Sequence, residues 1–316
     1  MLAHEPGLSC AVATQHFPGL PILARLSVTS PAADIAAIVG VADLSLELVV
    51  DDLPGLAGLA LQCRLGGVRP ASVVALPRKY LTSCQSVGPW PSGPKPDDFI
   101  QPLRDLFPNA AIGGGSLTNF TEFNRCHPDP DMVDFIIFGN TAIVHAADDR
   151  SVMETLQALP HIFASAKAIA PGKPLRLGLF SIGMRANPYG ADVVENLTGQ
   201  PVPMARNDAR QATDFAAANA VGVLAAATMA GVQSLALAMP DGPLGGWSKA
   251  GITPLGRVIL MASRMGGMVT VAHSGGGVSL TGSAGRMAAN LSDQPIKIKD
   301  FGPIAPYSVA LMEGLV

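Results

Sequence analysis

Cysteine is scarce in this chain, which has only four in 316 residues. These four show neither CxxC spacing nor the paired histidines that a structural zinc site requires. We therefore expect Cys10, Cys63, Cys84 and Cys126 to be free thiols in a reducing compartment. His127 follows Cys126, but no third ligand accompanies them at metal spacing, so we assign no metal.

Positive charge is also sparse. The chain has 21 Lys and Arg against 24 Asp and Glu, with a net charge of −3 and a pI near 6.0. The basic residues are scattered, and the absence of a basic stripe argues against a nucleic-acid partner. The glycine run Gly113 to Gly115 lacks the GxGxxG or GxxxxGK spacing that cradles phosphate, so we interpret it as a place of close packing. We predict no cofactor and a neutral or anionic small-molecule partner.

Segments that would direct the chain to a membrane are missing as well. The amino terminus, MLAHEPGLSC, has no basic region followed by an apolar core, so it does not resemble a signal peptide. The longest apolar stretch, Ala216 to Ala230, is interrupted by Asn219 and Thr228 and is short for a bilayer span. These features predict a cytoplasmic protein without a membrane partner.

Apolar residues are plentiful: 48% of the chain is hydrophobic and only 14% is charged. Such a balance indicates a large buried core, and the length suits one barrel of about 250 residues with additions. Apolar runs of strand length alternate with helix-length segments, a pattern typical of parallel βα units. We predict an α/β fold, a TIM (β/α)8 barrel over residues 1–267. Residues 268–316 alternate in short runs and predict a β-rich extension packed on the barrel.

Eight apolar runs account for the strands of this barrel. They are Ser9–Gln15, Leu23–Val28, Leu44–Val50, Ala71–Leu76, a run that begins near Ala110, Val133–Ile137, Leu175–Ser181 and Ser234–Ala238. The connection FPGLP after the first run is too short for a normal helix, so we expect irregular first units. A single helix is predicted over Ser151–Ile169, and another over Asp208–Ala230.

Charge appears where the fifth run stops, at Glu122, Asn124 and Arg125. We expect this segment to be strand-like. Ionisable groups in a parallel barrel survive at strand ends, and those at the carboxyl ends form the active site. The alternative is a surface ion pair that closes a loop.

Further polar residues follow the later runs. His145 and Asp148 come after the sixth run, and Arg185 and Asn187 after the seventh. Each has a structural alternative: a histidine bonded to the backbone, a helix cap, or an arginine that ties down a loop. Trp90 lies in a loop rich in Pro, Gly and Ser, where it would stack on a ligand ring or, as the commoner case, pack on the base of the loop.

Several phrases resemble the D-apionate lactonase family. They are GGGSLTNFTEFNRCHP, IVHAADDRSVMETL, SIGMRANP, DARQATDFAAANAVGVLAAATMAGV and AANLSDQPI, in consistent order from Arg25 to Ile298. The resemblance implies a barrel related to glycoside hydrolases that opens the lactone of a branched sugar acid. It also implies a β-rich domain ahead of the barrel, whereas this chain starts almost directly at its first predicted strand.

The resemblance carries over to the polar strand ends, but it departs at the last strand. Family members end that strand in an acidic residue, and here Met239 occupies the equivalent place; Asp241 lies two residues on and would face the same way. A retaining glycosidase needs two carboxyl groups about 5–5.5 Å apart, so this loss counts against that chemistry unless Asp241 replaces the acid.

Lactone opening needs a base, an oxyanion stabiliser and a proton donor. Our first hypothesis is a metal-independent hydrolase of a sugar-acid lactone in which Glu122 is the base, Arg185 or Arg125 stabilises the oxyanion and His145 donates the proton. Asn124, Asp148, Asn187, Asp241 and Trp90 would contact the substrate. The alternatives are a glycoside-hydrolase-type enzyme with Glu122 as acid/base, and a catalytically degenerate barrel that binds a sugar acid. A homodimer is one option for its assembly.

Overall fold

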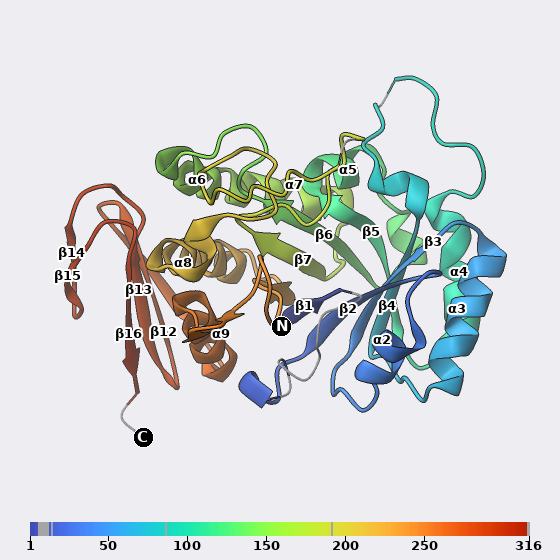
Figure 1. Cartoon of the computed structure of the whole chain (residues 1–316), viewed down its shortest axis with the longest axis horizontal. Coiled ribbons are helices and arrows are strands. Elements are labelled where there is room, and N and C mark those ends of the chain that lie inside the picture. Colours follow the sequence, from blue (N-terminus) through green and yellow to red (C-terminus); the bar gives the residue numbers. More distant parts are fainter. Residues whose placement is uncertain (6–12, 14, 86, 191, 315–316) are drawn as a thin grey trace.

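A ring of eight parallel strands forms the centre of the computed structural model, which describes residues 1–5, 13, 15–85, 87–190 and 192–314 (Figure 1). Neighbours in the sheet follow the order of the chain. The strands are β1 (Leu2–His4), β2 (Ile22–Ser27), β3 (Ser45–Val50), β4 (Ser72–Pro77), β5 (Ala111–Asn119), β6 (Phe135–Thr141), β7 (Leu175–Ser181) and β8 (Ser234–Ala236). The ring closes because the amide of Ala3 donates to the carbonyl of Ala238 at 2.9 Å. This is the predicted barrel.

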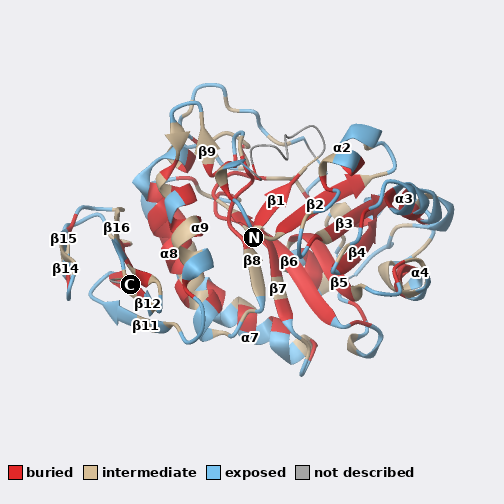
Figure 2. Ribbon diagram, turned by 90° about the horizontal axis from the view of Figure 1, so that it is seen from below, coloured by how far each residue is buried: buried red, intermediate tan, exposed pale blue. Residues whose placement is uncertain are grey.

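Helices surround the ring and cover its outer face (Figure 2). They are α2 (Ala32–Ala37), α3 (Leu53–Leu65), α4 (Ile100–Leu106), α5 (Phe120–Arg125), α6 (Asp149–Glu154), α7 (Leu159–Ile169), α8 (Asp214–Met229) and α9 (Pro254–Arg264). Alternate strand residues face outward to a large apolar cluster and inward to a smaller one that includes Leu23, Val74, Ile137 and Leu179. Continuous apolar strands are therefore buried on both faces, as expected in a closed parallel sheet.

The carboxyl-terminal segment forms a separate antiparallel sheet that lies against α8 (Figure 1). Its strands are β11 (Thr270–Ser274), β12 (Gly277–Gly282), β13 (Gly285–Asn290) and β16 (Val309–Glu313). The short pairs β9 (Trp247–Ser248) with β10 (Gly251–Ile252) and β14 (Ile296–Ile298) with β15 (Gly302–Ile304) complete the sheets. Short antiparallel strands were predicted here, and the domain division at residue 267 stays a prediction.

Several predicted elements are wrong in type or extent. The predicted helix Asp208–Ala230 begins as a 3-10 turn, Ala209–Ala212, and α8 starts only at Asp214. The predicted first strand, Ser9–Gln15, lies largely outside the described residues, and Ala13 and Gln15 are helical; the first strand is the three-residue β1. The predicted helix Ser151–Ile169 divides into α6 and α7, with a 3-10 turn between them. Pro160 lies at the start of α7, where its missing N–H is harmless, because a proline inside one continuous helix would break it.

Gly115 on β5 permits the close packing that the glycine run predicted. Its φ is +148°, and a Cβ there would lie 2.0 Å from the carbonyl oxygen of Ile137 on β6. Substitution Gly115→Ala is expected to lower the free energy of unfolding by about 1–3 kcal/mol, because strand β6 must move to admit the methyl group. Gly58→Ala is the matched control: Gly58 is exposed on α3, and a Cβ there meets nothing within 4 Å. Denaturant titration of both variants should show a loss for Gly115→Ala alone, and equal midpoints would contradict the packing argument.

Candidate active site

Four charged side chains meet inside the barrel near the carboxyl ends of the strands. Glu47 on β3 accepts from Arg25 Nε at 2.8 Å and from Arg185 Nη1 at 2.9 Å, both through Oε2. Arg185 also donates from Nε to Glu5 at 2.7 Å and from Nη2 to the carbonyl of His4 at 3.2 Å. We call Glu5, Arg25, Glu47 and Arg185 the barrel network. It links β1, β2, β3 and the loop after β7.

Burial and neighbouring charges shift the pKa values of Arg185 and Glu5 in opposite directions. Burial lowers the pKa of Arg185, but Glu47 and Glu5 outweigh it, so the pKa lies above its ordinary value. Burial raises the pKa of Glu5, yet the guanidinium groups of Arg185, Arg25 and Arg206 hold it below the usual range. The shifts of Glu5 and Arg185 both favour the charged form, so these two side chains stabilise each other as an ion pair.

A small cavity opens beside this network between β5, β6 and β7. Its lining includes Glu47, Asn119, Asn140, Thr141 and Arg185, and its volume is ≈ 20 Å³. A space of this size takes about one water molecule. Arg185 has five N–H groups, of which three are engaged in the bonds given above, so it retains donors for a group in this cavity.

Glu122 lies directly behind this cavity wall, in the first turn of α5. Its Oε2 accepts from the amide of Asn119 at 3.2 Å and from Thr118 Oγ1 at 3.4 Å, and both of these residues line the cavity. Its Oε1 is buried and has no hydrogen-bond partner among the described residues. The carboxylate thus has one bonded and one unbonded oxygen, while the side chain itself is not part of the lining.

The segment that carries Glu122 is helical, which corrects the strand-like prediction. Asn119 ends β5, and the bond from its amide to Glu122 three residues later is the capping-box contact that starts a helix. The spacing Asn-x-x-Glu before an apolar residue is visible in the sequence and would have indicated this helix. Arg125, at the end of α5, donates to Ser83 Oγ at 2.5 Å, and Asn124 is exposed on the same helix.

The other predicted residues lie farther out on the rim. His145 and Asp148 are both exposed on the loop after β6; Asp148 caps α6 by accepting from the amide of Ser151 at 2.9 Å. Hydrogen bonds to Ser151 hold the pKa of Asp148 below its ordinary value. Asn187 accepts from the amide of Tyr189 at 2.9 Å within its own loop. The structure therefore brings Arg185 to the cavity and leaves these residues outside it.

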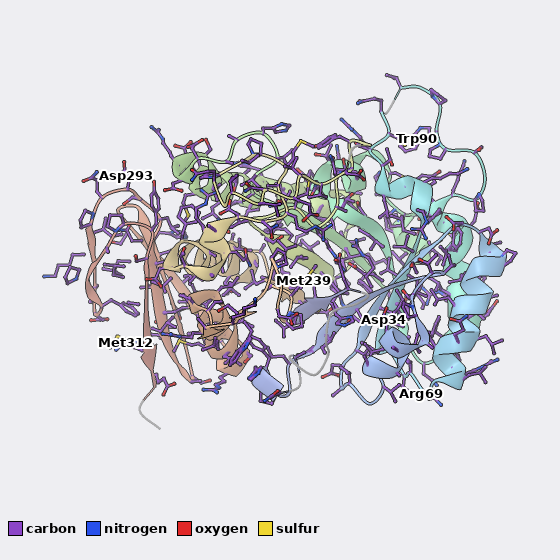
Figure 3. The ribbon with its side chains drawn as sticks, in the orientation of Figure 1. Asp34, Arg69, Trp90, Met239, Asp293 and Met312 are labelled. Carbon is purple, nitrogen blue, oxygen red and sulfur yellow. The ribbon has the colours of Figure 1, made fainter. Side chains whose placement is uncertain are left out.

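Trp90, Met239 and Asp241 occupy three different environments. Trp90 stacks on Tyr80, with ring centroids 6.3 Å apart, on the long loop that projects from the barrel (Figure 3). Met239 lies centrally and is buried in the inner apolar cluster of the barrel. Asp241 has a buried Oδ1 without a hydrogen-bond partner among the described residues. The position of the expected last-strand acid is thus filled by an apolar side chain.

Sequence reasoning missed Glu5, Arg25 and Glu47. The signal was present, because Arg25 and Glu47 interrupt the apolar strands ILARLS and SLELVV, and charged residues are almost never fully buried unless paired. Within the described ranges, no group of three His, Cys, Asp or Glu side chains is arranged to hold a metal ion. The same part of the chain has no helix long and apolar enough to cross a membrane.

Arg210 forms a second group of ion pairs beside the site. Arg210 donates to Asp208 from Nη2 at 2.6 Å and from Nε at 2.9 Å, and its Nη1 reaches Asp149 at 2.7 Å. These bonds fasten the start of the α8 segment to α6. The thiols of Cys63, Cys84 and Cys126 are free, as predicted, and Cys10 lies outside the described residues.

Eight parallel strands around a common axis, with charged groups at their carboxyl ends, define a TIM barrel. The chain belongs to the family described as the D-apionate lactonase TIM barrel domain, whose model matches residues 27–267. A curated D-apionate lactonase from Brucella anthropi is 40% identical over 187 residues, which are 59% of this chain and 31% of that protein. The chain therefore spans about a third of the length of this relative.

Two solved structures are similar to this chain at low sequence identity. A GH30 endoxylanase from Clostridium papyrosolvens C71 has a TM-score of 0.54 and 9% identity, covering 93% of this chain and 82% of its own. A GH39 enzyme from Xanthomonas axonopodis pv. citri has a TM-score of 0.49 and 11% identity, covering 88% and 70%. At such identities the likeness of the endoxylanase bears on the fold alone.

Proposed function

We propose that this chain hydrolyses the lactone of a sugar acid, such as D-apionolactone, at the carboxyl-terminal mouth of the barrel. The observation that carries the proposal is membership of the D-apionate lactonase barrel family over residues 27–267. The charged network and the adjoining cavity supply the polar groups that ester hydrolysis requires. The substrate class rests on the relative from Brucella anthropi.

In this mechanism Glu122 is the general base that removes a proton from the attacking water. Its Oε1 has no hydrogen-bond partner among the described residues, but it is buried behind Thr118 and Asn119, so this role requires the site to open and expose it to the attacking water. Arg185 stabilises the oxyanion of the tetrahedral intermediate through the N–H groups that Glu5, Glu47 and His4 do not use. His145, exposed on the loop after β6, gives a proton to the departing alkoxide.

Substrate entry requires the rim loops to move, because the cavity beside Arg185 has room for about one water molecule. The amide of Met184 donates to Ala205 at 2.8 Å within the loop after β7, and the amide of Met204 in the same loop donates to Ile143 after β6 at 2.7 Å, which joins the two loops. Opening of these loops would admit the lactone, and closing would exclude bulk water from the developing charge.

The two alternative functions differ in what they demand of the last strand. A retaining glycosidase needs a second carboxyl group, and Met239 at that position is buried among apolar residues. A barrel that only binds a sugar acid needs no such acid. Met239 thus favours the binding alternative over the glycosidase, with the buried Oδ1 of Asp241 as the remaining candidate carboxylate.

The proposal is tested by following base consumption at constant pH with D-apionolactone. Each hydrolysed lactone releases one ionised carboxylic acid, so turnover appears as one equivalent of added base. We expect consumption that is proportional to protein concentration and saturates with substrate. A rate equal to the spontaneous rate would remove the lactonase proposal and leave the binding alternative, which calorimetry with D-apionate would then test.

A further inference from the structure

The largest cavity among those described lies outside the barrel mouth, between the helices of the barrel and the carboxyl-terminal sheet. Its volume is ≈ 750 Å³, within the range of small-molecule pockets. One wall is formed by α6, α7 and α8, and the other by the turn between β11 and β12, residues 291–293 and Tyr307. Figure 1 shows this sheet standing beside α8.

The floor of this cavity is apolar and hollowed by small side chains of α8. Gly222, Ala225 and Ala226 lie on the cavity side, together with Met229. At Gly222 a Cβ would lie 2.5 Å from a methyl carbon of Leu156, so a larger residue there would push the Leu156 side chain aside. These small side chains leave space between α8 and the sheet.

The rim is polar and is contributed by both walls. Arg150 and Glu154 come from α6, with Arg150 Nε donating to Glu154 Oε1 at 2.7 Å. His273 comes from β11, and Asp293 and Tyr307 come from the connections between strands of the carboxyl-terminal segment; Figure 3 places Asp293 at its upper end. Burial and the nearby carboxylate of Asp293 raise the pKa of Tyr307, so its hydroxyl remains a donor. Donors and acceptors therefore face the same space.

Tyr307 has a backbone conformation that is uncommon for a bulky side chain. Its φ is +51°, in the left-handed region. The conformation is held because its ring packs edge-on against Phe215, with centroids 5.3 Å apart, and its amide donates to the carbonyl of Ser292 at 3.2 Å. Strained residues of this kind cluster at ligand sites. These contacts hold the Tyr307 side chain at the cavity in a conformation that glycine would adopt more readily.

We propose that this cavity is a second binding site and that it takes a neutral saccharide. A sugar presents C–H groups to an apolar floor and hydroxyls, which both donate and accept, to a mixed polar rim. The rim has one guanidinium against the two carboxylates of Glu154 and Asp293, which disfavours an anion. The site is independent of the proposed lactone hydrolysis.

The test is saturation-transfer NMR and calorimetry with the neutral disaccharides cellobiose and xylobiose. Ala226→Met should fill the floor and weaken binding at least tenfold, because the new side chain occupies the space of the sugar ring. Ala168→Met is the matched control, since Ala168 is exposed on α7 away from the cavity and should leave binding unchanged. Asp293→Asn, at an exposed position, should weaken binding without affecting the fold.

Two results would overturn the proposal. One is the absence of saturable binding of both sugars up to about 10 mM, tenfold above a Kd of about 1 mM. The other is binding that Ala226→Met and Asp293→Asn leave unchanged, which would place the sugar elsewhere. The dye 8-anilinonaphthalene-1-sulfonate provides a further comparison. If the dye binds, the Ala226→Met substitution weakens its binding, and neither sugar binds, then the cavity accepts an apolar ligand and the saccharide assignment is wrong. Lactone turnover is measured separately, so either proposal can fail alone.

Discussion

Substitution Glu47→Gln is expected to lower the free energy of unfolding by about 3–5 kcal/mol, the usual result of removing one partner from a buried ion pair. The carboxylate of Glu47 is nearly inaccessible to solvent, with 2% of its side chain exposed, and it receives both Arg25 and Arg185. Glutamine can accept a hydrogen bond but supplies no negative charge. Two buried guanidinium groups would then face only Glu5.

Denaturant titration followed by circular dichroism would measure this effect. Glu154→Gln is the matched control, because the Arg150–Glu154 pair is largely exposed and solvent screens such a pair. Equal midpoints for the two variants would contradict a stabilising role of the barrel network. The network also implies acid sensitivity: Glu5 has a depressed pKa, so its contribution is complete above the ordinary value of 4.5 and is lost as the pH falls below it.

Substitution Glu122→Gln is expected to reduce kcat for lactone hydrolysis by about 10²-fold or more, as loss of a general base usually does. The amide oxygen of glutamine can still accept from the amide of Asn119, so the helix start and the fold should persist. KM should change less than kcat, because proton removal takes place in the transition state.

Glu195→Gln serves as the control for this rate measurement. Glu195 is an exposed carboxylate on the loop after β7, 3.6 Å from Arg206, and should leave kcat unaltered. If Glu122→Gln retains the full rate while circular dichroism confirms its fold, Glu122 is not the base. Glu47 would then be the next carboxylate to consider, because it lines the cavity itself.

The barrel was predictable from sequence because its strands are continuous apolar runs. The boundaries of β7 coincide with the predicted run Leu175–Ser181, and β3 begins one residue after its predicted start, at Ser45. Strand β1 was not predictable in this way: three residues carry too little periodic signal, and what holds them is pairing with β2 and closure onto Ala238. Helix α5 was missed although its capping residues were visible.

The site was less accessible to sequence reasoning, since its geometry depends on contacts between distant residues. Arg185 was identified from its position after β7, but its partners Glu5 and Glu47 are 180 and 138 residues away along the chain. Only ring closure brings them together. We placed Glu122 and Arg185 in one active site; Arg185 lines the cavity, whereas Glu122 lies behind the wall formed by Thr118 and Asn119, so the two do not share it in this structure.

The wide separation of these partners along the chain also bears on the order of folding. Arg25 and Glu47 belong to adjacent strands, so they can meet early, whereas Arg185 can join them only after β7 has docked. We expect the contacts of Arg185 to be absent from the folding transition state and to act mainly on the rate of unfolding. The contacts of Arg185 would then slow unfolding more than they speed folding.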